Sequence, residues 1–272
     1  MKYSIHKRGE IAMKNILKIM LMMITIYTIT GSAVYAAEIP VSDQDQLITS
    51  RDWTEISNLQ DEMKKEEPDA TIDYDKALKV YVDCNLIKLQ TADTKKLTSA
   101  LESANYVWVI PFKMEKTYGM FTVAKGLPLS EEAKSVLTKA EQEEVKNHAG
   151  KWMITETAEH TVEPYYDILL EKREALSDCT RVVLVGSQPG MRQPVALGMD
   201  DETARIWISL GYQYPVMEKI PETQNVESGV YSFDSVAEIS DTYIEDSEVS
   251  TGAGVQSRSC LLYTSDAADD KA

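Results

Sequence analysis

The stretch that decides the fold runs from Tyr106 to Gly126 and reads "YVWVIPFKMEKTYGMFTVAKG". Its two halves, "YVWVIPF" and "YGMFTVAKG", are rich in aromatic and β-branched residues, which favour strands. The link "KMEKT" between them is short and polar, so the two runs predict a β-hairpin. We therefore expect antiparallel pairing in the middle of the chain.

The segments around this hairpin predict further helices and strands. Residues 77–83, "ALKVYVD", alternate as a strand does. Residues 93–104 place Leu97 and Leu101 on one helical face, with Asp93 as the cap. A long helix is predicted from Ser130 to Gly150, with Val136, Leu137, Ala140 and Val145 facing inward. Strands are predicted at 151–156, 179–186, 194–199 and 204–211, and a helix at 163–177.

The order of these elements sets the fold class. We expect an α+β domain over residues 74–215, in which packed helices cover a mostly antiparallel sheet. The order strand, helix, hairpin occurs over residues 74–126 and again over residues 151–211. This recurrence raises the hypothesis of a duplicated strand-helix-hairpin unit, although the residues themselves do not repeat.

Two segments flank the expected domain. Residues 37–73 form an N-terminal segment in which the spacing of apolar residues from Trp53 to Met63 predicts a surface helix, ended by Pro68. Residues 216–259 are acidic and, towards their end, rich in Ser, Thr and Gly, which predicts a flexible linker.

The first 36 residues have the pattern of a secretory signal peptide. Lys14 and Lys18 precede the apolar run of residues 19–36, and Val34 and Ala36 occupy the –3 and –1 positions of a cleavage site. The alternative is an uncleaved N-terminal anchor. Codons for residues 8–10 can contain a ribosome-binding sequence, so we expect Met13 to be the true start. We therefore expect the protein outside the cytoplasmic membrane of a bacterium, secreted or at the cell surface.

The last 13 residues, "CLLYTSDAADDKA", continue nothing before them. Back-translated, residues 260–270 match the mosaic end and adapter used to prepare sequencing libraries. We therefore interpret residues 260–272 as an adapter-derived artefact, and the natural chain as truncated after Ser259. A membrane helix, a wall anchor or another module could follow the linker.

Net charge narrows the range of partners. Residues 37–259 contain 22 Lys and Arg against 40 Asp and Glu. Such a surface repels nucleic-acid phosphates and anionic lipid head groups, so we expect no nucleic-acid partner. We expect membrane association only through the signal peptide or a lost C-terminal anchor. The charge favours solubility, or attraction to cationic partners.

Two cysteines, Cys84 and Cys179, lie between the two termini. An exported protein can oxidise such a pair to a disulfide. Buried free cysteines, which behave as small apolar residues, are the alternative. Neither cysteine lies in a C-x-x-C motif or beside a histidine, which gives no support to a redox or nucleophilic role.

No stretch carries a complete catalytic motif, and we expect no cofactor and no metal ligands. The segment "ETAEH", Glu156 to His160, is similar to the inverted zinc-protease pattern H-x-x-E-H, but Glu156 stands where that pattern has its first histidine. We expect an exposed loop there. Glu156, Glu159 and His160 would form the site of a secreted hydrolase, which is the alternative function.

Acidic pairs and aromatic residues have plainer explanations. We expect the pairs Asp43/Asp45 and Asp73/Asp75 to be solvated, because they lack the glycine and final glutamate of a calcium loop. Asp200/Asp201 could serve glycoside hydrolysis only across a cleft, which one antiparallel turn gives no reason to expect, so we expect this pair to be solvated too. Aromatic residues in predicted strands indicate core packing, with an exposed strip for glycan or peptide binding as the alternative. These residues are Trp108, Trp152 and Trp207.

The combination of signal peptide, small α+β domain and acidic linker resembles uncharacterised exported proteins of Gram-positive gut bacteria. That resemblance implies a location and no activity. We expect a non-catalytic binding or interaction module whose partner is an unknown extracellular protein or glycan. A sensory or inhibitory module that meets its partner along a sheet edge is a third interpretation.

Overall fold

The computed structural model describes residues 39–240 except 161–162, 187, 192, 213 and 223–224. Predictions made for residues 1–36, for residues 241–259 and for residues 260–272 lie outside the described residues. The described residues all belong to one contact unit. In the part of the chain that the structure describes, no helix is both long and apolar enough to cross a bilayer.

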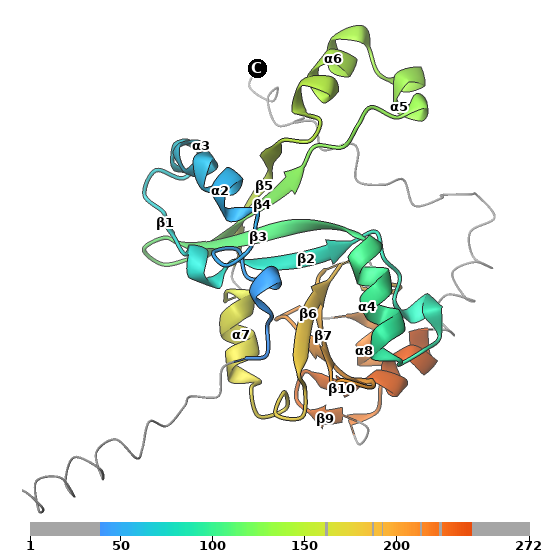
Figure 1. The fold of residues 1–272 in the computed structure, drawn as a ribbon. Coiled ribbons are helices and arrows are strands. Elements are labelled where there is room, and N and C mark those ends of the chain that lie inside the picture. Colours follow the sequence, from blue (N-terminus) through green and yellow to red (C-terminus); the bar gives the residue numbers. More distant parts are fainter. Residues whose placement is uncertain are drawn as a thin grey trace, which may run out of the picture. The chain divides into compact units, whose positions relative to one another are not determined.

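The described residues form one ten-stranded sheet with the order β5-β4-β3-β2-β6-β7-β8-β10-β9, and β1 pairs with β3 (Figure 1). The predicted hairpin is present as β3 and β4, which pair antiparallel from Val107–Ala124 to Lys113–Tyr118. The strands are β1 (Thr71–Ile72), β2 (Leu78–Val82), β3 (Asn105–Lys113), β4 (Tyr118–Lys125), β5 (Trp152–His160), β6 (Arg181–Val185), β7 (Val195–Met199), β8 (Ala204–Ser209), β9 (Asn225–Glu227) and β10 (Val230–Ser232).

One parallel contact joins two antiparallel halves of the sheet. Strand β2 pairs with β6 in parallel through Val80–Leu184 and Tyr81–Val185, whereas the other strand pairs are antiparallel. The prediction of an α+β fold with a mostly antiparallel sheet is therefore confirmed. The order strand, helix, hairpin does recur along the chain, but β2 pairs with its own hairpin whereas β5 pairs with β4.

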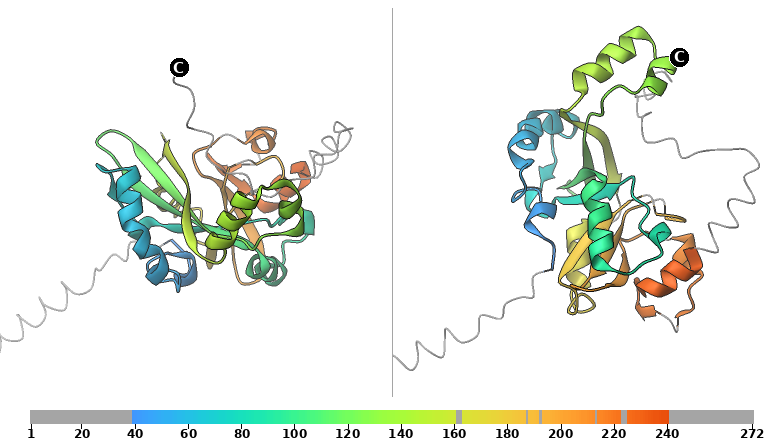
Figure 2. Two further views of the ribbon diagram at one scale, coloured as in Figure 1. Left: turned by 90° about the horizontal axis from the view of Figure 1, so that it is seen from above. Right: turned by 45° about the vertical axis from the view of Figure 1, so that its right-hand side comes forward.

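Helices cover both faces of this sheet (Figures 1 and 2). Alternation along β6 sends Val183 to one face and Val182 to the other, and each face has its own apolar core. One face packs against α7, and the other packs against α4, α8 and residues 233–240. The helices are α2 (Trp53–Ile56), α3 (Gln60–Glu66), α4 (Thr94–Ser103), α5 (Glu131–Val136), α6 (Lys139–His148), α7 (Tyr165–Glu171) and α8 (Pro215–Glu218).

The N-terminal segment adds a third apolar cluster beside β3, β4 and β5. The predicted surface helix is present as α2 and α3, joined by a short 3-10 turn. Ile56 and Met63 on its inner side are fully buried, and Leu47 from the preceding turn joins them. Residues 39–73 therefore share a core with the sheet.

The linker expected from residue 216 does not begin there. Residues 215–240 form α8, β9, β10 and a final helix, and they bury Val216, Val230, Phe233 and Val236. Their acidic residues point outward while the apolar residues between them fill the core of β7 and β8. Composition alone missed this alternation because the apolar residues are sparse.

The long helix expected after Ser130 is also wrong in detail, because it is two helices. The first helix ends at Val136, and Thr138 caps the start of the second. The Thr138 side chain accepts a hydrogen bond from the Glu141 N–H, and the Glu141 carboxylate accepts one from the Thr138 N–H. Such a capping box favours a new helix start. Val136, expected inside, is 78% exposed. The two helices form an arm between β4 and β5.

Candidate functional site

A buried group of charged side chains lies where β2 meets β6. We expected Asp45 to be solvated, but only 2% of its surface is exposed. Its carboxylate accepts hydrogen bonds from Arg181 (3.0 Å), from the Tyr81 hydroxyl (2.7 Å) and from Ser42 (2.6 Å). Burying a carboxylate is costly unless it is paired in this way. This arrangement corrects the expectation for Asp45.

Lys79 completes the charge balance around Asp45. Its ammonium lies 3.6 Å from the Asp45 carboxylate and 4.6 Å from the ring centroid of Tyr106. Burial lowers the pKa of Lys79, and the carboxylates of Asp45 and Asp52 oppose that shift. Burial also raises the pKa of Tyr81, with the Asp45 charge as the second cause. These groups face one another rather than solvent, so the charges of Asp45 and Lys79 are paired within the protein.

Asp52, just before α2, is a second buried aspartate whose carboxylate is hydrogen-bonded within the protein. Its carboxylate accepts hydrogen bonds from the Tyr106 hydroxyl (2.8 Å) and from the indole N–H of Trp108 (3.1 Å), both on β3. The two aspartates therefore fasten the N-terminal segment to the two central strands and to β3. We call Asp45, Asp52, Lys79 and Arg181 the buried charge cluster.

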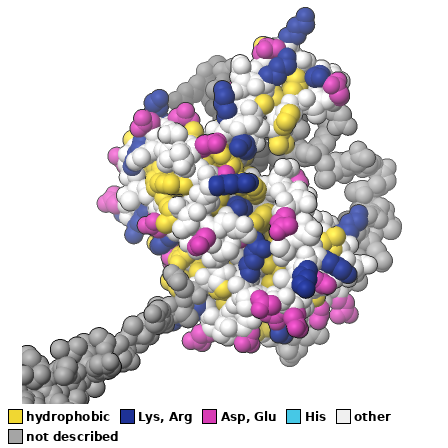
Figure 3. Space-filling model, viewed as in Figure 1, with side chains coloured by type: hydrophobic (Ala, Val, Ile, Leu, Met, Phe, Trp, Pro, Cys, Tyr) yellow, Lys and Arg dark blue, Asp and Glu magenta, His cyan; other side chains and the backbone are white. Residues whose placement is uncertain are grey.

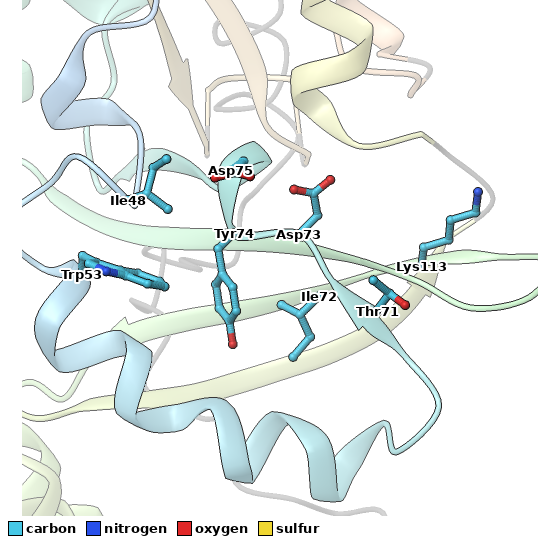
Figure 4. A pocket seen from close by; sticks show the side chains of 8 residues that line it. All are labelled: Ile48, Trp53, Thr71, Ile72, Asp73, Tyr74, Asp75 and Lys113. Atoms are coloured by element: carbon cyan, nitrogen blue, oxygen red, sulfur yellow. The ribbon is translucent and has the colours of Figure 1, made fainter.

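An open hollow of about 510 Å³ lies beside β1 (Figure 4). The N-terminal turn, α2, β1, the turn after β1 and β3 supply its lining, which combines aromatic, aliphatic and acidic side chains with one threonine and one lysine. We call it the Trp53–Tyr74 hollow. Its lining residues are Ile48, Trp53, Thr71, Ile72, Asp73, Tyr74, Asp75 and Lys113.

The two aromatic rings meet edge to face at one end of the hollow. The ring centroids of Trp53 and Tyr74 lie 5.2 Å apart, a favourable geometry for aromatic pairs. The Tyr74 hydroxyl approaches the Met63 sulfur at 3.7 Å, and burial raises the pKa of Tyr74. Figure 4 shows Asp73 and Asp75 turned to the side opposite the Tyr74 ring. The chain at Tyr74 thus presents a ring on one side and carboxylates on the other.

Glu156 and Glu159 of the alternative hydrolase site do not converge. The segment "ETAEH" is part of the outer strand β5 rather than the expected loop, with Glu156 opposite Thr122 and Glu159 opposite Gly119. Side chains three positions apart on a regular strand lie on opposite faces. Glu156 and Glu159 are exposed and therefore point away from each other. His160 ends β5 opposite Tyr118.

Cys84 and Cys179 are free thiols on opposite faces of the sheet. Cys84 packs against the core of α4 and α8, whereas Cys179 belongs to the core of α7. The two thiols therefore belong to different cores. Burial raises the pKa of both thiols to about 11. The structure therefore does not bring the proposed disulfide partners together.

The predicted strand tryptophans are core residues. Trp108 and Trp207 are fully buried and Trp152 is 7% exposed, so none of them contributes to an exposed strip. Trp53 and Tyr74 are among the half-buried aromatics, and the sequence pattern did not link them to each other. Trp53 and Tyr74 are 21 positions apart in the sequence, and nothing in the sequence indicates that they meet. The sequence analysis noted only Asp73 and Asp75, which flank Tyr74.

The acidic pair Asp200 and Asp201 lies in the turn between β7 and β8. Asp200 accepts from the backbone N–H groups of Glu202 and Thr203, which shape the β7–β8 turn. Among the described residues, no group of three or more His, Cys, Asp or Glu could hold a metal ion. On the face drawn in Figure 3, acidic and basic side chains are interspersed.

No protein-family model, curated protein or solved structure matches this chain.

Proposed function

We propose that this chain is a non-catalytic extracytoplasmic domain, secreted or displayed at the cell surface, that binds an extracellular protein or glycan. The observation that carries the proposal is the Trp53–Tyr74 hollow. Binding sites are typically concave and largely apolar, with a few polar groups that orient the ligand. The hollow has that composition, since Ile48 and Ile72 accompany the two rings and carboxylates flank them.

The buried charge cluster does not itself supply a catalytic acid or base. Catalytic acids and bases must reach a substrate to act. In this cluster Asp45 is bonded to Arg181 and Tyr81, so its carboxylate is already satisfied by the protein. Contacts within the protein are therefore enough to explain why Asp45, Arg181 and Tyr81 lie together.

A secreted hydrolase is the rival proposal, and the geometry of β5 weighs against it. Glu156 and Glu159 would need to approach a substrate together, and they lie on opposite faces of one strand. The rival is tested by replacing Glu156 with Gln and assaying protease and glycosidase substrates. Turnover that this variant loses would support the hydrolase and contradict our proposal.

Sheet-edge binding has little support at the two ends of the sheet order. The outer strand β5 carries exposed Glu156 and Glu159, and charged edge residues discourage pairing with another strand. The other outer strand, β9, has only three residues, of which Val226 is 56% exposed.

Export and binding are tested on the whole chain in one expression series. Mass spectrometry of the exported protein should give Ala37 as its first residue, because the leader pattern places cleavage after Ala36. The purified protein should then bind at least one immobilised extracellular protein or glycan with saturation. Retention in the cytoplasm, or no saturable binding across both arrays, would contradict the proposed function.

A further inference from the structure

We propose that the Trp53–Tyr74 hollow binds an extended peptide segment of an extracellular protein in which lysine or arginine alternates with aliphatic residues. This inference rests on the proposed binding function and specifies its ligand. Three features support this ligand: the shape of the chain at Tyr74, the charges at the hollow and the pairing of β1.

The alternating basic and aliphatic side chains of the proposed peptide match the arrangement of side chains at Tyr74. The ring of Tyr74 lies on one side of its turn, beside Trp53, and the carboxylates of Asp73 and Asp75 lie on the other (Figure 4). Successive side chains of an extended peptide also point to opposite sides. A peptide that crosses this turn can therefore place apolar side chains against the rings while its basic side chains reach the carboxylates.

The charges at the hollow favour a cation. Asp75 is exposed, and Asp73 lies 3.7 Å from Lys76, whose ammonium is closer to Asp167 at 2.8 Å. Lys76 is thus shared between two carboxylates. The ammonium of Lys113 lies 5.8 Å from the Tyr118 ring centroid, towards the β3–β4 hairpin. With a net charge of –16, the chain as a whole also attracts cationic partners.

Strand β1 can supply backbone contacts to the same peptide. Thr71 and Ile72 pair with Lys113 and Phe112 of β3 on one side. On its other side β1 has no strand partner in the described part of the chain. Peptides often bind by adding a strand to such an edge, where main-chain bonds give affinity and side chains give specificity.

The test uses the whole purified chain and short synthetic peptides of alternating lysine and leucine. Trp53 is the half-buried tryptophan at the hollow, while Trp108, Trp152 and Trp207 are buried, so a fluorescence change that disappears in Trp53→Phe reports binding there. We expect the lysine–leucine peptide to produce that change. Acetylating its lysines should weaken binding by about tenfold or more, since the charges are lost.

A charge-reversed pair of variants locates the contact. Asp75→Lys should weaken binding by about tenfold, whereas Glu171→Lys, an equal charge change at an exposed position on α7, should have little effect. Circular dichroism should show both variants folded. Equal weakening by the two variants would overturn the site, because it would mean that only net charge attracts the peptide.

The remaining outcomes separate this inference from the proposed function. Equal affinity for the acetylated peptide would overturn the cationic ligand. A glycan that changes Trp53 fluorescence while the lysine–leucine peptide does not would overturn the peptide inference and retain the binding function. Failure of the peptides together with every immobilised protein and glycan would contradict both.

Discussion

The carboxylate of Asp45 lies 3.0 Å from the guanidinium of Arg181, although 136 positions separate the two residues in the chain. Arg181 opens β6, and the same carboxylate contacts Lys79 and Tyr81 of β2. Strands β2 and β6 share only two paired positions in the sheet. The N-terminal segment strengthens that junction, since Val41 pairs with Val182 of β6 and Gln46 pairs with Leu78 of β2.

Replacing Asp45 with Ala should destabilise the protein strongly. Removing one partner of a buried ion pair leaves the other uncompensated, which costs about 3–5 kcal/mol. Arg181 would lose its carboxylate partner, and Lys79 would keep only the more distant charge of Asp52. Urea unfolding followed by circular dichroism measures the change. Asp43→Ala is the matched control: Asp43 is exposed in the same turn, so its loss should change stability by no more than about 0.5 kcal/mol. Similar values for both variants would show that Asp45 is not a structural residue.

Cys84 and Cys179 should remain reduced in the purified protein exposed to air. They pack into cores on opposite faces of the sheet, so the native fold holds them apart. With Cys260 replaced by Ser, the unfolded protein should titrate two thiols without reductant. The folded protein should react slowly, because burial raises both pKa values to about 11 and keeps the thiolate scarce near neutral pH. A mass lower by two hydrogens, with no reactive thiol after unfolding, would contradict this arrangement.

The same thiols should make stability fall in alkaline solution. Their pKa rises from an ordinary value of 9.0 to about 11 on folding, so the unfolded chain loses these protons first. The contribution is complete below pH 9 and disappears as the pH rises through 11. Unfolding free energies measured between pH 8 and 11 should therefore decline less steeply in the Cys84→Ala/Cys179→Ala variant. The difference between the two curves isolates the thiols from Lys79 and the buried tyrosines; identical slopes would contradict the prediction.

Gly126, at the base of the α5–α6 arm, should not tolerate a side chain. A Cβ there would lie 2.1 Å from the backbone oxygen of His148, and the Gly126 carbonyl accepts from the Gly150 N–H. Gly126→Ala should cost about 1–3 kcal/mol, as overpacking does, because backbone must move. At Gly186 the nearest atom would be 3.6 Å away, an ordinary contact. Thermal unfolding of both alanine variants checks this difference, and hydrogen exchange of α6 should rise only in Gly126→Ala. A fully stable Gly126→Ala variant would show that the base of the arm is not tightly packed.

Local patterns predicted the elements whose signals lie within a few residues. The hairpin of β3 and β4 follows from two strand-forming runs around one polar link. The start of α4 follows from Asp93, whose side chain accepts from the N–H groups of Lys95 and Lys96. The break before α6 also had a local signal, the Thr138–Glu141 capping box, which the apolar spacing of Val136 and Val145 outweighed in our prediction.

The candidate site was beyond such reasoning, because its residues are brought together by pairing across the sheet. Trp53 meets Tyr74 only because α2 packs beside the turn that follows β1. Glu156 and Glu159, close in sequence, are separated because β5 is a strand rather than a loop.

The sequence by itself determined the antiparallel hairpin, the helix caps and the α+β class, since these depend on side-chain alternation and on hydrogen bonds between near neighbours. Only the tertiary structure decided that Asp45 is buried, that Cys84 and Cys179 lie on opposite faces and that Trp53 and Tyr74 line one hollow. The physical reason is that burial depends on which distant segments cover a residue. Asp45 is paired rather than solvated because the fold places Arg181 beside it. The sequence near Asp45 does not indicate that partner.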